Sequence, residues 1–221
     1  MVEKIKYAIF DMDGTLIDSL GYWEYFWVEF GKKYFNDPNF EIDEDIDKSV
    51  RTITMKEASI LLRDRYLPDK SGDDVLDLAN SMIENHYKTR VDAKFGVLEF
   101  LKQMKARGVK MCVASATEPK YIKYVLERCS LDGFFEFIIS CTEVGVGKEK
   151  PDVFLKALER LGGNLSEACV FEDSFVALET AKNAGFMTVG IYDKHNYGQD
   201  RLRAAADVYI AGGQSLLDMV D

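Results

Sequence analysis

Short continuous runs of apolar residues alternate with amphipathic helical segments over most of this chain. A run that is apolar throughout, rather than at every second residue, is typical of a strand covered on both faces. Strands that alternate with helices in this way form a parallel sheet, so we predict an α/β fold. Six strands are expected, at residues 5–10, 109–114, 135–140, 168–171, 187–191 and 208–210. Helices between them are expected at residues 95–107, 121–129, 152–161 and 174–184, with Thr117 as the cap of the second.

One long segment, residues 17–90, interrupts this alternation because it carries helical patterning and no recognisable strand. A helix is expected after Ser71, which is placed to cap its N-terminus. Inserted directly after the first strand, the segment would lie above the carboxyl end of the sheet, where open α/β sheets bind ligands. We therefore predict a core domain of residues 1–16 and 91–221 and a helical cap domain of residues 17–90 that acts as a lid. The first cap helix should bury most of its aromatic side chains, which are Tyr22, Trp23, Tyr25, Phe26, Trp27 and Phe30.

The composition and charge argue against several classes of protein. Hydrophobic residues make up 47% and charged residues 30% of the 221 residues, which is ordinary for a globular protein. The net charge is −10 and no block of basic residues occurs, so a nucleic-acid or anionic-membrane partner is not expected. No apolar stretch is long enough to cross a bilayer. The four cysteines lack the spacing of a zinc site, so we expect reduced thiols and a cytoplasmic protein.

Two pairs of acidic residues follow predicted strands. The first pair, Asp11 and Asp13, lies in AIFDMDGTLIDS, and the second, Glu172 and Asp173, lies in VFEDS. Residues two apart in an extended chain share a side, so Asp11 and Asp13 can face one space, while Gly14 lets the backbone turn. Four carboxylates at one edge of a sheet would repel one another strongly unless a divalent cation neutralised them. Ligands that are all oxygen atoms favour Mg²⁺.

Two further side chains complete a set suited to a phosphoryl group. Ser115 ends the predicted strand in MCVASAT, and Lys148 precedes a predicted helix in GVGKEKPD. A metal ion, a lysine and a hydroxyl group around a carboxylate can each contact one of the three phosphoryl oxygens. Taken singly, each residue has an ordinary structural explanation, because an acidic pair after a strand often caps a helix and a lone lysine is usually solvated. Their joint occurrence at strand ends favours a catalytic site.

In the order of these motifs, the chain resembles the haloacid dehalogenase-like hydrolases over essentially its whole length. DMDGT matches the first motif of that superfamily, Ser115 the second, Lys148 the third, and the pair Glu172 and Asp173 the fourth. The similarity is to the branch with a helical cap, which includes phosphatases of small metabolites, such as phosphoglycolate phosphatase, and β-phosphoglucomutase. The resemblance implies a Rossmann-like parallel sheet with a mobile helical cap.

The resemblance also implies a role for each motif residue. Asp11 would be the nucleophile that forms an aspartyl-phosphate, and Asp13 would donate a proton to the leaving oxygen and then accept one from water. Ser115, Lys148 and Thr15 would bind the phosphate group, and Thr15 lies in the same loop as the nucleophile. The ligands of Mg²⁺ would be Asp11, Asp173, Glu172 and the backbone carbonyl of Asp13.

We therefore predict a Mg²⁺-dependent phosphatase that acts, as a monomer, on a small phosphorylated metabolite such as a sugar phosphate. A phosphosugar mutase would use the same core and differ in its cap, so that alternative stays open, as does a non-catalytic metabolite-binding module. A dehalogenase is disfavoured because it would have no leaving oxygen for Asp13 to protonate. Arg51 is the basic cap residue best suited to a distal group of the substrate. His86 and His195 have no partner at metal-ligand spacing and are expected to lie outside the site.

Overall fold

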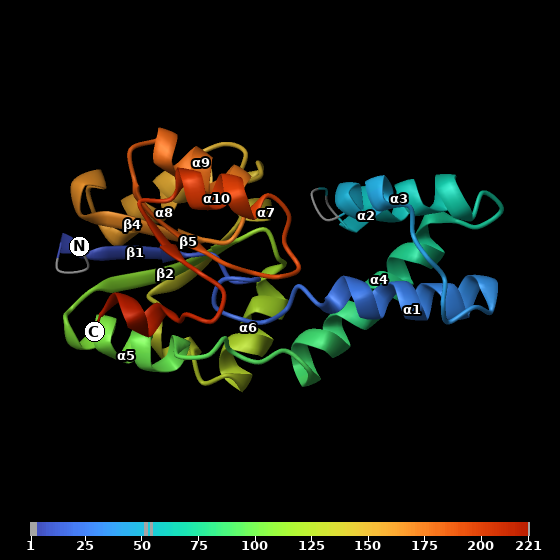
Figure 1. Cartoon of the computed structure of the whole chain (residues 1–221), viewed down its shortest axis with the longest axis horizontal. Helices are drawn as coiled ribbons and strands as arrows, with labels where there is room; N and C mark the ends of the chain where they lie inside the picture. Colours follow the sequence, from blue (N-terminus) through green and yellow to red (C-terminus); the bar gives the residue numbers. More distant parts are fainter. Residues whose placement is uncertain (1–3, 51–52, 54, 221) are drawn as a thin grey trace. The chain divides into compact units, whose positions relative to one another are not determined.

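The computed structural model describes residues 4–50, 53 and 55–220, and Figure 1 shows the whole chain. It forms two compact units, one of Met1–Leu20 with Val91–Asp221 and the other of Gly21–Arg90. Residues 17–20 belong to the first unit because the chain there pairs with the returning segment. Ile17 bridges to Ala93, and the backbone N–H of Asp18 donates to the carbonyl of Asp92 at 2.9 Å. The role of the second unit as a lid stays a prediction.

Within the described residues, the first unit contains six parallel strands in the order β3–β2–β1–β4–β5–β6. This arrangement confirms the predicted α/β fold with a Rossmann-like sheet. Strands β5 and β6 have the predicted bounds, whereas β1 begins at Tyr7 rather than at Ile5. The strands are β1 (Tyr7–Phe10), β2 (Lys110–Ser115), β3 (Phe137–Ser140), β4 (Ala168–Glu172), β5 (Met187–Ile191) and β6 (Val208–Ile210).

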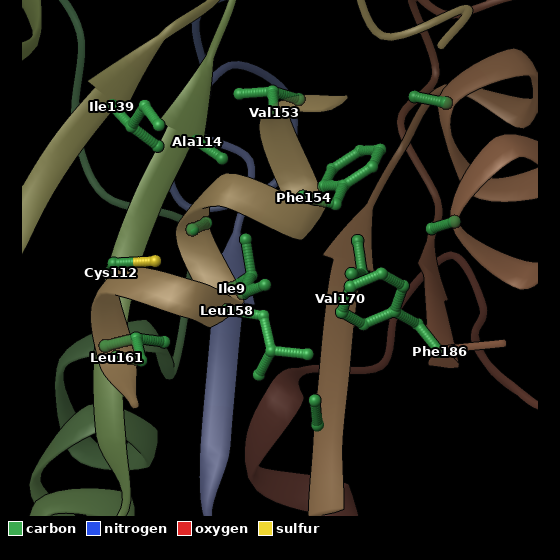
Figure 2. Packing of buried hydrophobic residues seen from close by; sticks show 14 of the residues in the cluster. Ile9, Cys112, Ala114, Ile139, Val153, Phe154, Leu158, Leu161, Val170 and Phe186 are labelled. Atoms are coloured by element: carbon green, nitrogen blue, oxygen red, sulfur yellow. The ribbon is translucent and has the colours of Figure 1, made fainter. Parts of the chain in front are cut away.

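Helices cover both faces of this sheet, which explains why the strands are mainly continuous apolar runs rather than alternating apolar and polar residues. Ile9 of β1 packs in a buried cluster with Phe154 and Leu158 of α8 (Asp152–Leu161), as Figure 2 shows. The next residue, Phe10, has its ring centre 6.3 Å from that of Phe100 in α5 (Val97–Ala106). Helices α5 and α8 lie on opposite sides of the sheet (Figure 1), so successive residues of β1 face different layers.

The start of one helix differs from the prediction. Glu118, not Thr117, occupies the N-cap position of α6, and Pro119 follows in the first turn. The Thr117 hydroxyl donates to Asp13 at 2.8 Å instead, so its predicted role as a cap is wrong. Other helices described in this unit are α6 (Pro119–Arg128), α7 (Cys141–Val144), α9 (Phe175–Asn183), α10 (Gln199–Ala205), and the 3₁₀ helices η2 (Asp132–Phe134), η3 (Leu165–Glu167) and η4 (Leu216–Met219).

The second unit is helical throughout its described residues and has an aromatic core. As predicted, Ser71 caps the last helix, in a reciprocal capping box with Asp74. The aromatic side chains of the first helix are mostly buried, also as predicted: Tyr22, Phe26, Trp27 and Phe30 are buried, and Trp23 and Tyr25 are partly buried. Arg51, predicted to contact the substrate, lies outside the described residues. The helices are α1 (Tyr22–Phe35), α2 (Glu44–Val50), α3 (Met55–Tyr66) and α4 (Gly72–Thr89).

The four cysteines, all within the described residues, are free thiols. Burial raises the pKa of Cys112, Cys141 and Cys169, which keeps these thiols protonated and unreactive. They act as small apolar side chains in the first unit. Across the part of the chain that the structure describes, no helix combines the length and hydrophobicity needed to span a bilayer.

Candidate active site

The candidate site lies at the carboxyl edge of the sheet, where the neighbouring strands β1 and β4 end. The chain order of the strands reverses between these two, and open α/β sheets bind ligands at such a switch point. Asp11 follows β1, and Asp173 follows Glu172, the last residue of β4. The register aligns Phe10 with Phe171, and the backbone N–H of Asp11 donates to the Phe171 carbonyl at 2.9 Å. Strand pairing therefore brings the two predicted acidic motifs together.

Asp11, Glu172 and Asp173 form a buried carboxylate cluster. These residues are only 6%, 2% and 3% exposed, and one oxygen of each lies within 4.8 Å of the others. Lys148, from the loop before α8, reaches this carboxylate cluster. Its Nζ donates to Asp11 Oδ1 and, at 2.8 Å, to Glu172 Oε2. The structure thus brings the predicted lysine into the site, where it contacts two carboxylates.

Burial makes the carboxylate cluster difficult to ionise fully. It raises the pKa of Asp11 to about 8, a shift that Glu172 increases and Lys148 opposes. Burial, followed by Glu172, also raises the pKa of Asp173 well above its usual range. Burial disfavours the charged form of Lys148, yet Asp11 and Glu172 raise the pKa of its ammonium above the usual value. Among the described residues, the ammonium of Lys148 pairs with two of these three acidic groups, Asp11 and Glu172, which leaves a deficit of positive charge.

The donors of the carboxylate cluster fit Mg²⁺. All three are carboxylate oxygens, which are the hard ligands that this ion prefers. A charge of +2 would also balance three carboxylates and one lysine. Asp11, Glu172 and Asp173 would hold the ion. Among the described residues, the cluster at metal-ligand spacing does not include the carboxylate of Asp13, and the predicted use of the Asp13 carbonyl stays a prediction.

The carboxylate of Asp13 contacts hydroxyl groups. Ser19 Oγ donates to its Oδ1 at 2.6 Å, and Thr117 Oγ1 donates to its Oδ2 at 2.8 Å. The sequence had not indicated Ser19 or Thr117 as residues of the site. The adjacent Gly14 has a φ of +75°, and a Cβ at this position would collide with the carboxylate of Asp173. Glycine is therefore required there both for the turn and for the close approach of Asp173.

Ser115 and Thr15 were both predicted to contact phosphate, and they lie in different surroundings. Ser115 is buried at the end of β2, and its Oγ accepts the backbone N–H of Thr117 at 3.0 Å. Because a hydroxyl group both accepts and donates, this bond leaves its hydrogen to donate to another oxygen. The Thr15 hydroxyl donates to Asp173 Oδ1 at 3.4 Å, which is a long contact to the carboxylate cluster. Phosphate binding stays a prediction for both residues.

Asn196 contacts the carboxylate cluster although the sequence had not indicated it. Its Nδ2 donates to Asp173 Oδ2 at 2.7 Å and to the Asp173 carbonyl at 3.2 Å. Asn196 lies in the loop between β5 and α10, next to His195, whose backbone N–H donates to Asp193. One feature of the sequence could have indicated Asn196, which is its position in the loop after a predicted parallel strand. Such loops gather at the same edge of the sheet as the acidic motifs.

Comparisons with known proteins identify the family and the fold of this chain. The family described as haloacid dehalogenase-like hydrolase matches residues 5–185. The phosphorylated carbohydrates phosphatase of Thermotoga maritima is 26% identical over 200 residues, which cover 90% of this chain and 91% of that protein. The β-phosphoglucomutase of Bacillus subtilis is 24% identical over 215 residues, which cover 93% and 89%. The crystal structure of CbbY from Rhodobacter sphaeroides in complex with phosphate has the same fold, with a TM-score of 0.75, 20% identity and 93% coverage of each chain.

The family match extends over most of the chain and includes all four motifs at the carboxyl edge of the sheet. The fold, the order of the motifs and the family match lead to the same assignment. The chain belongs to the haloacid dehalogenase-like hydrolases and is an enzyme of that family.

Proposed function

We propose that this hydrolase is a Mg²⁺-dependent phosphatase of small phosphorylated carbohydrates or similar metabolites. The observation that carries the proposal is the burial of Asp11 with two further carboxylates beside the single ammonium of Lys148. A carboxylate that attacks a phosphate dianion needs positive charge around it, and the deficit in this cluster suits a divalent cation. The named activities of two relatives, a phosphorylated carbohydrates phosphatase and a β-phosphoglucomutase, support a phosphorylated sugar as the substrate class.

In the first step, an oxygen of Asp11 attacks the phosphorus atom. An O–P bond forms as the bond from phosphorus to the leaving oxygen breaks, which gives an aspartyl-phosphate. Asp13, protonated beforehand, donates its proton to the leaving oxygen. The hydroxyl groups of Ser19 and Thr117 contact both oxygens of the Asp13 carboxyl group and fix its orientation.

In the second step, water attacks the phosphorus atom, the bond to Asp11 breaks, and inorganic phosphate is released. Asp13 accepts a proton from that water and is ready for the next cycle. Lys148 and Ser115 bind phosphoryl oxygens in both steps, and the contact of Lys148 with Asp11 supports this assignment. When bound, Mg²⁺ supplies positive charge that offsets the charge of the phosphoryl oxygens.

We also propose that the helical unit, Gly21–Arg90, acts as a lid and that some of its residues contact the substrate. Excluding water would protect the aspartyl-phosphate, and the lid must open again for exchange. We also expect the protein to act as a monomer in the cytoplasm, without a nucleic-acid or membrane partner. The net charge of −10 supports the absence of polyanionic partners.

A screen of phosphate release tests the proposed function. Phosphorylated sugars, polyols and nucleotides are incubated with the protein, and inorganic phosphate and isomer formation are measured in parallel. We expect phosphate release with Mg²⁺ and none after EDTA. Added Mg²⁺ should restore the activity, whereas Ca²⁺ should restore little, because its coordination is larger and looser. Isomer formation without phosphate release would contradict the proposal, as would full activity of metal-free protein.

Replacing the nucleophile should abolish turnover. Asp11→Asn keeps the size of the side chain, but an amide does not attack phosphorus, so kcat should fall by on the order of 10³-fold or more. Phosphate release is measured on the best substrate from the screen, with circular dichroism as the check on folding. Asp18→Asn, which changes an exposed aspartate of the same loop, is the matched control and should keep the wild-type rate. A similar rate for Asp11→Asn and wild type would refute the assignment.

Removing the proton donor should affect substrates unequally. Asp13→Ala should slow the first step for alkyl phosphates by about 10²–10⁴-fold and that for p-nitrophenyl phosphate far less, because nitrophenolate leaves without a proton. Single-turnover release of the alcohol is measured, so that hydrolysis of the aspartyl-phosphate does not mask the difference. Equal losses for both substrates would show that Asp13 does not protonate the leaving oxygen.

A further inference from the structure

We infer that Asn196 is a positioning residue that holds the carboxylate of Asp173 for the divalent cation, and that an ion pair between Lys94 and Asp193 anchors its loop. The inference rests on the proposed function, since it takes Asp173 as a ligand of that cation. Asn196 lies beyond residues 5–185, to which the family match extends. Its role is therefore derived from contacts in this chain.

The side-chain amide of Asn196 is oriented by the backbone of its own loop. Its Oδ1 accepts the N–H of Tyr197 at 2.9 Å, which turns Nδ2 toward Asp173. Nδ2 then donates to Asp173 Oδ2 at 2.7 Å and to the carbonyl of Asp173 at 3.2 Å. Because an amide donates only through its nitrogen, the Tyr197 contact determines which end of the group meets the carboxylate.

Asp173 depends on this amide more than on its other hydrogen-bond partner. Among the described residues, the second hydrogen bond to its carboxylate comes from Thr15 and is 3.4 Å long, against 2.7 Å for Asn196. The other two carboxylates of the cluster are held by the ammonium of Lys148. A neutral amide orients Asp173 without cancelling its negative charge, so that charge stays available to a cation. Groups that orient metal ligands in this way typically contribute about 10–100-fold to metal affinity.

The loop that carries Asn196 is fixed by a largely buried ion pair. Lys94 Nζ lies 2.7 Å from Asp193 Oδ2, and the side chain of Asp193 is 2% exposed. The same Nζ donates to the carbonyl of Tyr192 at 3.1 Å. The backbone N–H of Lys94 donates to the carbonyl of Leu16 at 2.9 Å. Lys94 thus connects the loop of Asn196 to the loop that carries the nucleophile.

The test compares Mg²⁺ binding between two leucine variants. Asn196→Leu removes the amide at nearly constant size, and Asn183→Leu makes the same change at the exposed end of α9. Mg²⁺ is titrated calorimetrically into metal-free protein without substrate. We expect Asn196→Leu to weaken Mg²⁺ binding by about 10–100-fold and Asn183→Leu to leave it unchanged. With p-nitrophenyl phosphate, Asn196→Leu should need more Mg²⁺ for half-maximal rate yet approach the wild-type kcat at saturation, because Asp173 is still present.

Equal Mg²⁺ affinity in Asn196→Leu and wild type would overturn the inference. A loss of Mg²⁺ affinity in Asn183→Leu as large as that in Asn196→Leu would also overturn it. If circular dichroism shows that Asn196→Leu does not fold, Lys94→Met provides the second test. Lys94→Met should also weaken Mg²⁺ binding. An unchanged Mg²⁺ affinity would overturn the proposed role of the ion pair between Lys94 and Asp193. Wild-type protein that binds Mg²⁺ but releases no phosphate would contradict the proposed function alone, while the binding comparison would still decide the role of Asn196.

Discussion

Charge balance in a buried space is the constraint on which the rest of this site depends. Three carboxylates place oxygens within 4.8 Å of one another, and the single ammonium of Lys148 contacts two of them. Burial disfavours the charged form of each carboxylate and the neighbouring carboxylates repel it, so the pKa values of Asp11 and Asp173 rise. Under the proposed function, a divalent cation restores the balance and allows Asp11 to attack as a carboxylate.

The fold enforces the closeness of these carboxylates. Strands β1 and β4 pair in parallel at the switch point of the sheet. Fully buried residues hold the two strands in register, such as Phe10 of β1 and Phe171 of β4. The rings of these two residues stack with their centres 4.3 Å apart. Burying a side chain of this kind contributes about 1.5–3 kcal/mol, which offsets part of the repulsion at the strand ends. Gly14 then lets Asp173 approach, because any larger residue would occupy the space of its carboxylate.

Much of the core fold could be predicted from the sequence, because continuous apolar runs mark strands that are covered on both faces. The bounds of β5 and β6 agree, and the acidic motifs lie at the carboxyl ends of the strands expected to carry them. The partners of those acids could not be predicted in the same way. Thr117 contacts Asp13 across 104 positions, and Asn196 contacts Asp173 across 23, through loops whose conformations no local pattern determines. Thr117 was assigned to a helix cap for that reason, since only its local sequence was available.

Thermal unfolding of Asp173→Asn, with and without Mg²⁺, tests the charge balance most directly. The substitution removes one negative charge but keeps the size of the side chain and an oxygen that accepts from Asn196. In EDTA, the variant should unfold at a temperature at least about 2 °C higher than wild type, which corresponds to ~1 kcal/mol for a chain of this size. Excess Mg²⁺ should stabilise wild type more than the variant, which lacks one anionic ligand. This charge balance would be contradicted if the variant unfolded at a lower temperature than wild type in EDTA and Mg²⁺ raised the unfolding temperature of both proteins equally.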